Sequence, residues 1–110
     1  MDSKEFKNLL GIPVKVTKVK DDFIWLDGEK YPINKIPSGI SIDGDLNLRY
    51  TRITELPDDL MVGGYLDLRY TPIKELPDDL MVGGSLDLED TPIKELPEGL
   101  KVGGKIYKDF

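Results

Sequence analysis

The sequence repeats itself with a period of 20 residues, and this repeat limits the possible folds more than any other feature. A single copy is too short to bury its own apolar side chains, whereas stacked copies bury them against one another as the coils of a solenoid. The copies follow a different segment, residues 1–35, and the 110 residues have the size of one domain. The copies are residues 36–55, 56–75, 76–95 and, in part, 96–110.

Each copy contains a short stretch in which apolar and polar residues alternate. In the second copy Leu66 and Leu68 alternate with Tyr65, Asp67 and Arg69, which is typical of a strand with one buried side. Stacking such strands in register predicts a parallel sheet with neighbours ~4.8 Å apart. The predicted fold class is therefore mainly β, a parallel β-solenoid.

The rest of each copy is rich in residues that interrupt helices. Residues 56–95 contain two prolines and two glycines per copy, so we expect turns, extended chain or a 3₁₀ turn there rather than a helix. Gly63 and Gly64 are expected at a corner that needs either a positive φ or close contact between coils.

The repeat also resembles that of a known family. Leu66-x-Leu68-x-x-Thr71-x-Ile73 matches the LxLxxNxL core of leucine-rich repeats, with Thr at the Asn position. The whole unit, LPxxLxVGGxLDLxxTxIxx, is similar to the short leucine-rich repeats of bacterial and bacteriophage genomes. The resemblance covers residues 36–110. It implies a cytoplasmic accessory protein of a bacterium or a phage-infected host cell, such as an anti-defence inhibitor of a host enzyme.

The segment before the repeats is predicted to cover the open apolar end of the solenoid as an N-terminal cap. A short capping helix is expected over residues 3–10. Two strands, at 14–19 and 23–26, are expected to form a β-hairpin, with Trp25 in the core of the cap. Residues 31–35 are in phase with the repeats and predict a degenerate first coil.

The polar positions beside the inward leucines differ between copies, whereas the inward positions do not. Packing fixes the core, so the outer positions are free to be shaped for a partner, and Tyr and Arg are enriched in interface hot spots. The predicted partner-binding face consists of Asp45, Asn47, Arg49, Tyr50, Tyr65, Asp67, Arg69, Tyr70, Ser85, Asp87, Glu89 and Asp90.

The alternative is that this face is only solvated. On that interpretation Arg49–Asp67 and Arg69–Asp87 pair diagonally across neighbouring strands. Exposed ion pairs of this kind contribute ~0–1 kcal/mol each.

A second row of charges is acidic, and stacked carboxylates repel one another. Solvent, a basic protein partner or a cation can offset the repulsion. The sequence lacks the GGxGxD and EF-hand patterns of calcium sites, so we predict no metal and no cofactor. The acidic stripe consists of Asp58, Asp59, Asp78, Asp79 and Glu98.

The last copy differs from the others at its inward positions, because Lys108 replaces a leucine. An uncovered coil exposes strand edges and apolar side chains, which favours self-association. A homodimer through this coil would use Ile106, Tyr107 and Phe110.

Composition argues against several classes of protein. The chain has no Cys and no His, which removes thiolate and imidazole chemistry, and we predict that it is not an enzyme. Its net charge of 15 − 21 = −6 argues against direct binding of nucleic acid or of an anionic membrane surface.

The favoured function is a non-catalytic protein–protein interaction module, acting as an adaptor or a stoichiometric inhibitor. One alternative is an acidic mimic of nucleic acid, which blocks a DNA- or RNA-binding enzyme through electrostatics that weaken in salt. The other alternative is a structural solenoid that assembles with itself.

Overall fold

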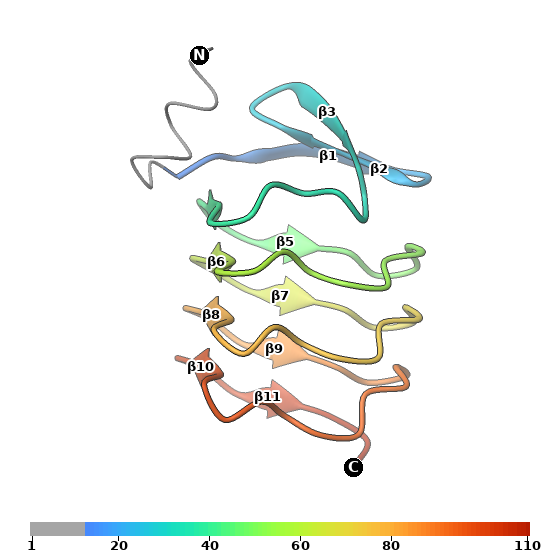
Figure 1. Ribbon diagram of the computed structural model, residues 1–110, viewed down its shortest axis with the longest axis vertical. Helices are drawn as coiled ribbons and strands as arrows, with labels where there is room; N and C mark the ends of the chain where they lie inside the picture. The colour runs from blue at the N-terminus through green and yellow to red at the C-terminus, as the bar shows by residue number, and fades with distance from the viewer. Residues whose placement is uncertain (1–12) are drawn as a thin grey trace.

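A computed structural model describes residues 13–110, so the helix expected over residues 3–10 lies outside the described residues. Coils are stacked along the long axis of a molecule that measures 43 × 28 × 18 Å (Figure 1). The parallel β-solenoid predicted from the repeat is confirmed, and the described residues contain no helix.

Two parallel four-stranded sheets run the length of the stack (Figure 1). Successive strands pair with an offset of 20 residues, so that Leu46 lies beside Leu66 and Leu66 beside Leu86. One sheet contains β4 (Ser41–Ile42), β6 (Met61–Val62), β8 (Met81–Val82) and β10 (Lys101–Val102). The other contains β5 (Leu46–Asn47), β7 (Leu66–Asp67), β9 (Leu86–Asp87) and β11 (Ile106–Tyr107).

The sheet formed by β4, β6, β8 and β10 adds to the prediction for the return path, where turns, extended chain or a 3₁₀ turn were expected but no second sheet. Leu60 and Val62 are buried and Met61 between them is exposed. This is the alternation of a strand with one buried side. The stretch was missed because only two residues per coil, such as Met61 and Val62, form the ladder.

The glycine pair between the two sheets allows close contact between coils rather than a positive φ. Gly64 N donates to Gly44 O at 2.8 Å, and Gly84 N donates to Gly64 O at 2.9 Å. A Cβ atom on Gly84 would lie 2.9 Å from the carbonyl carbon and oxygen of Gly64. The backbones of successive coils therefore meet at this corner with no room for a side chain.

The core is a set of apolar columns that run through the coils. The inward leucines and isoleucines of the first three copies are buried, whereas Leu96, Leu100 and Val102 in the last copy are only half-buried. Ile106 is 36 % exposed, although Leu46, Leu66 and Leu86 of the same column are completely buried. The last coil thus has one apolar side that no described residue covers.

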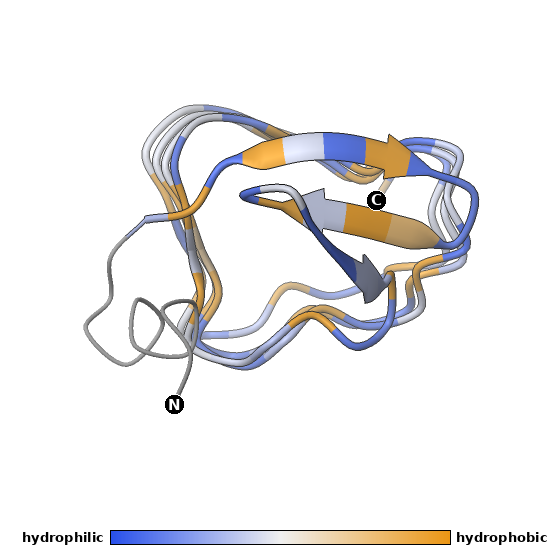
Figure 2. Ribbon diagram, turned by 90° about the horizontal axis from the view of Figure 1, so that it is seen from above, coloured by the Kyte–Doolittle hydropathy of each residue, from blue (hydrophilic) through white to orange (hydrophobic). Residues whose placement is uncertain are grey.

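At the other end, an antiparallel sheet forms the predicted cap and lies across the first coil (Figures 1 and 2). It contains β1 (Val16–Lys20), β2 (Phe23–Leu26) and β3 (Glu29–Pro32), in that order. The expected hairpin is present as β1 and β2, and β3 is an additional strand. Ile24 and Leu26 are completely buried on the side that faces the solenoid.

The cap is also continuous with the stack of coils. Val14, expected in the hairpin, instead forms a parallel bridge with Ile42 and extends the sheet of β4. After β3, the side chain of Asn34 accepts a hydrogen bond of 2.8 Å from Thr54 N, 20 residues later. The 20-residue register therefore already applies to the chain at Asn34.

The expectation that Trp25 belongs to the core of the cap is wrong. Successive side chains on a strand point to opposite sides, so burial of Ile24 and Leu26 places Trp25 on the outer side, where it is half-buried. Its ring lies 6.5 Å from that of Phe23, and the Nζ atom of Lys18 lies 4.9 Å from its centroid.

Candidate binding face

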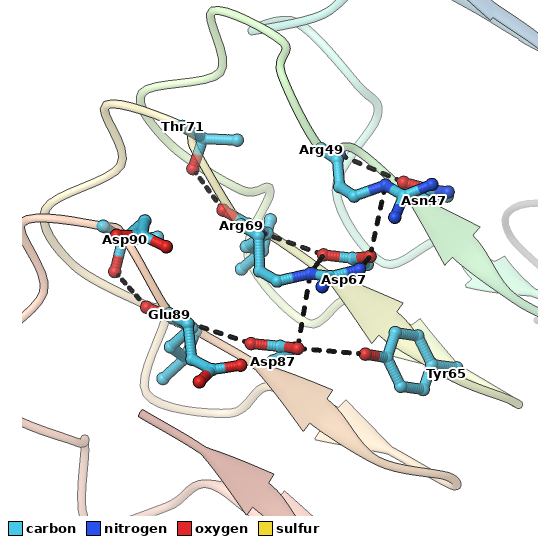
Figure 3. A network of polar contacts seen from close by, with 12 residues as sticks. Asn47, Arg49, Tyr65, Asp67, Arg69, Thr71, Asp87, Glu89 and Asp90 are labelled. Atoms are coloured by element: carbon cyan, nitrogen blue, oxygen red, sulfur yellow. Dashed lines mark hydrogen bonds and ion pairs between the residues drawn. The ribbon is translucent and has the colours of Figure 1, made fainter. Parts of the chain in front are cut away.

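A network of charged side chains crosses the outer side of the sheet formed by β5, β7, β9 and β11 (Figure 3). We call Arg49, Asp67, Arg69 and Asp87 the charge ladder, because basic and acidic groups alternate along it from coil to coil. Arg49 Nε lies 3.6 Å from Asp67 Oδ2, and Arg69 Nη2 lies 2.9 Å from the same oxygen. Arg69 Nε then lies 3.4 Å from Asp87 Oδ2 in the next coil.

The two carboxylates of the ladder are buried, which corrects the expectation that they are exposed. Asp67 and Asp87 are only 3 % and 4 % exposed. Both alternate with inward leucines and so lie on the outer side of the sheet, but the side chains of Arg69 and Tyr65 contact them. Long side chains from neighbouring positions therefore replace the solvent around these charges.

Each buried carboxylate has several hydrogen-bond donors. Asp67 accepts from Arg69 Nε at 3.1 Å and Arg69 Nη2 at 2.9 Å. Asp87 accepts from Glu89 N at 3.0 Å and from the Tyr65 hydroxyl at 3.2 Å. A buried charge is costly unless it is paired and hydrogen-bonded, so these donors are needed for the fold itself.

The diagonal pairs Arg49–Asp67 and Arg69–Asp87 do form, as the solvated alternative predicted. They differ from ordinary surface pairs because one partner in each is desolvated. Hydrogen bonding to Asp67 is the largest effect that raises the pKa of the Arg69 guanidinium. Two hydrogen bonds to Asp67 and the ion pair with Asp87 hold the Arg69 guanidinium against the sheet.

The same local turn explains why the network repeats in each coil. Side chains at 47, 67 and 87 accept hydrogen bonds from the backbone N–H two residues later, at 3.0–3.1 Å. The hydroxyl of Thr71 donates to Leu68 O at 2.8 Å, and Thr51 and Thr91 make the equivalent bond. Asx and Ser/Thr side chains stabilise turns in this way.

The turn places a pair of tyrosines on the surface. The rings of Tyr50 and Tyr70, which we call the tyrosine pair, are stacked with centroids 4.8 Å apart and an interplanar angle of 4°. Tyr50 is 72 % exposed and Tyr70 48 % exposed. Their φ angles are +60° and +57°, a region that costs roughly 1–2 kcal/mol for an ordinary L-residue.

The third coil departs from this pattern at both positions. Glu89 replaces the arginines of the ladder, and Asp90 replaces the tyrosine at the positive-φ position, with φ +58°. Asp90 N donates a hydrogen bond of 2.6 Å to the carboxylate of Asp109 in the last coil. Within residues 13–110, neither Glu89, Asp90 nor Asp109 has an ion pair with Lys or Arg.

The charges around Glu89 change its proton affinity. The pKa of Glu89 is raised, chiefly by the negative charge of Asp87, and then by burial and by a hydrogen bond with Asp87. Asp109 raises this pKa further, whereas Arg69 lowers it. The acidic groups therefore have the larger combined effect at this position.

Several predicted face residues hold the backbone of neighbouring coils together. Asp45 accepts a hydrogen bond of 2.8 Å from Tyr65 N, and Ser85 Oγ accepts one of 3.1 Å from Lys105 N. With Asn47, Asp67 and Asp87 committed to turns, the residues that present side chains outward are Arg49, Tyr50, Tyr65, Arg69, Tyr70, Glu89 and Asp90.

The acidic stripe lies elsewhere, in the turns that precede β6, β8 and β10. All five of its side chains, Asp58, Asp59, Asp78, Asp79 and Glu98, are exposed. In the part of the chain that the structure describes, no group of three or more acidic side chains is arranged to hold a metal ion.

One surface feature was missed by the sequence reasoning. Met61 and Met81 are exposed on the sheet of β4, β6, β8 and β10. They line a shallow groove of about 370 Å³ together with Gly63, Gly83 and Val82. The alternation of Leu60, Met61 and Val62 was the available signal.

The fold defines the protein as a parallel β-solenoid with two sheets. A comparison with protein-family models, curated proteins and solved structures finds no match for the chain. The resemblance to short leucine-rich repeats therefore stays a prediction. Among residues 13–110 there is no helix with the length and apolar character needed to span a membrane.

Proposed function

We propose that the protein is a non-catalytic module that binds another protein through the tyrosine pair and the adjacent arginines. The observation that carries the proposal is the exposed stack of Tyr50 on Tyr70. Aromatic side chains that are large, rigid and exposed supply contact area at low entropic cost and are typical interface anchors.

The backbone at these tyrosines supports the proposal. Asn and Gly tolerate a positive φ better than Tyr does, so an unstrained turn would carry one of them at positions 50 and 70. Backbone strain of this kind concentrates at functional sites. The tyrosines are therefore better explained by what they contact than by the stability of the turn.

Arg69, which lies beside the pair, is already ordered before a partner binds. Arg69 is fixed by Asp67 and Asp87, so little side-chain entropy remains to be lost on association. The proposed face is accordingly rigid.

The proposal is tested by affinity capture from lysate of the source cell or its host, with a Tyr50→Asn, Tyr70→Asn double variant. We expect the variant to lose the captured protein and to change the free energy of unfolding by less than about 1 kcal/mol, because strain relief offsets loss of ring stacking. Asp59→Asn is the matched control, since Asp59 has φ +57° and lies in the acidic stripe. If the wild type, the double tyrosine variant and Asp59→Asn captured the partner equally well, this face would be rejected as the binding surface.

Substitution of Arg69 or Tyr65 would give an ambiguous result, because both side chains hydrogen-bond to buried carboxylates. Inhibition of a host or defence enzyme, and a cytoplasmic location, are more specific proposals that rest on the family resemblance. The protein captured by the wild-type chain would test both.

Self-association is a second candidate function, favoured by the exposed Ile106, Tyr107 and Phe110 of the last coil. Light scattering of the full chain and of a chain ending at Gly104 would compare their masses. A mass that corresponds to a monomer in both would reject the C-terminal interface.

A further inference from the structure

The outer side of the N-terminal cap carries a set of side chains found nowhere else on the solenoid. Ile24 and Leu26 face the coils, so the alternate positions of the same sheet face away from them, at the end of the molecule seen from above in Figure 2. The strand register places six side chains there, which we call the cap face: Lys18, Lys20, Phe23, Trp25, Lys30 and Pro32. The cap face thus has three lysines, two aromatic rings and no carboxylate.

The lysines of the cap face lie on both sides of the rings. Trp25 on β2 is paired with Lys18 on β1 and with Lys30 on β3. The Nζ atom of Lys18 lies 4.9 Å from the centroid of the Trp25 ring. The Nζ atom of Lys30 lies 4.0 Å from the centroid of the Phe23 ring. The two rings follow one another on β2 with their centroids 6.5 Å apart, so ammonium groups border them on both neighbouring strands.

The charges of these lysines are not neutralised within the part of the chain that the structure describes, where every ion pair belongs to the charge ladder. Glu29 is paired with the inward-facing Leu26, on the other side of the sheet. The other carboxylates of residues 13–35 lie in turns at the ends of the strands, at Asp21, Asp22 and Asp27. Residues 36–110, by contrast, contain 8 basic and 15 acidic residues. A positive surface therefore lies at one end of a net acidic stack.

This combination of groups matches single-stranded nucleic acid better than it matches other anions. Proteins that bind single strands combine basic side chains that contact phosphates with aromatic side chains on which bases stack. An acidic peptide would use the lysines and leave the rings unused, and a duplex keeps its bases stacked on one another. Exposed cation–π contacts are weak, whereas a base stacks more strongly on an aromatic ring. A base can therefore displace Lys30 from the Phe23 ring and free its ammonium group for a phosphate.

We propose that the cap face binds a short stretch of single-stranded nucleic acid, with bases on its two rings and phosphates on its three lysines. The site is separate from the tyrosine pair and does not rest on the proposed function. The expectation against nucleic acid was based on the net charge of −6, which takes no account of where the charges lie. At physiological salt a charge more than about 8 Å away is largely screened, so the lysines of the cap face determine the potential at the site.

The test uses the fluorescence of the full-length protein, which reports on the cap face because Trp25 is the only tryptophan of the chain. Ten-nucleotide oligo(dT) and oligo(U) are the probes and distinguish DNA from RNA. We expect at least one of them to quench Trp25 in a saturable manner. Two to three phosphate contacts should give a slope of about −1.4 to −2.1 for log K against log salt concentration.

A double variant, Lys18→Gln with Lys30→Gln, removes two ammonium groups from the cap face. We expect it to keep the circular dichroism spectrum of the wild type, to bind about tenfold or more weakly, and to have a smaller salt slope. Lys74→Gln with Lys94→Gln is the matched control, because it makes the same change of charge at two exposed lysines of the coils. The control should bind within about twofold of the wild type.

Phe23→Leu tests the rings separately from the charges, because it keeps an apolar side chain and removes one stacking surface. We expect about fivefold weaker binding with an unchanged salt slope, since stacking releases no counterions. Absence of quenching by both oligonucleotides, equal losses in the two lysine double variants, or full affinity in Phe23→Leu would overturn the inference. It would also be overturned if a decaglutamate peptide or phosphatidylserine vesicles bound as tightly as the oligonucleotide, because the face would then recognise negative charge or a membrane surface instead.

Discussion

Arg69 binds the buried carboxylate of Asp67 through two hydrogen bonds, from Nε at 3.1 Å and from Nη2 at 2.9 Å. The geometry is bidentate, which gives direction as well as strength. Because Asp67 is only 3 % exposed, the pair stabilises the fold more than an ordinary surface ion pair does. It also fixes the position of the guanidinium beside the tyrosine pair.

Arg69→Ala should destabilise the protein by about 2 kcal/mol, because it leaves buried Asp87 without a cation and buried Asp67 with Arg49 alone, while the partial exposure of Arg69 limits the loss. Arg49→Ala should cost no more than about 1 kcal/mol, since Arg49 makes only one pair, at 3.6 Å. Urea unfolding measures both. Equal losses of stability in the two variants would show that the buried Asp87 carboxylate does not need Arg69 for its stabilisation.

Gly84→Ala should destabilise the protein by about 1–3 kcal/mol, because the added methyl group meets the backbone of Gly64 at 2.9 Å. Gly63→Ala should cost less, since its methyl group would lie 3.2 Å from the carbonyl oxygen of Ile42. Thermal unfolding of both variants compares them. If Gly84→Ala left the free energy of unfolding unchanged, the two coils would be able to move apart at this corner without a loss of stability.

Leu66→Ala should cost about 2–5 kcal/mol, because it opens a cavity among completely buried side chains. Ile106→Ala, in the same column, should cost roughly 1 kcal/mol or less in the monomer, since Ile106 is already 36 % exposed. Chemical unfolding at low protein concentration is the measurement. A large loss in Ile106→Ala that grew with concentration would instead indicate a covered interface.

Stability should fall as pH rises through the titration of Glu89. Its folded pKa lies above the unfolded value, with Asp87 and Asp109 opposing ionisation and Arg69 favouring it. The folded state therefore binds more protons between the two pKa values, and the stabilisation present below the unfolded pKa is lost as pH passes the folded one. Glu89→Gln should be more stable than the wild type at pH 7, with the difference shrinking toward pH 4. A difference that does not vary with pH would contradict this assignment.

Neutralising the acidic stripe should distinguish a protein-binding face from mimicry of nucleic acid. Changing Asp58, Asp59, Asp78 and Asp79 to Asn should leave partner capture unchanged if the tyrosine pair is the binding surface. Under mimicry, capture would be lost and the wild-type complex would weaken steeply with salt. Capture measured at two salt concentrations decides between them.

The repeat was sufficient to predict the solenoid and its register, because a period of 20 residues permits only one pairing of Leu46, Leu66 and Leu86. It did not reveal the second sheet, in which two residues per coil carry too short an alternation to stand out. The prediction for Trp25 failed because a large aromatic residue was assigned to the core without regard to the alternation that buries Ile24 and Leu26.

The sequence was sufficient to predict which residues form the candidate site. It was not sufficient to predict which of them are buried or which rings stack. Strand alternation correctly put Asp67 and Asp87 on the outer side of the sheet. Their burial depends on where Arg69 and Tyr65 extend across neighbouring coils, which is a property of side-chain conformation and not of sequence spacing. The stacking of Tyr50 on Tyr70 was hidden for the same reason, although their common column was evident.

The stacked glycine corner gives the molecule a modular construction. Each coil meets the next mainly through equivalent positions one period apart, from Gly44 to Gly64, Gly84 and Gly104. A duplicate of residues 76–95 inserted after residue 95 would find matching neighbours on both sides and lengthen the molecule by one strand spacing, ~4.8 Å. The distance between the cap and the last coil can therefore be changed in discrete steps of one coil, by adding or removing whole 20-residue copies.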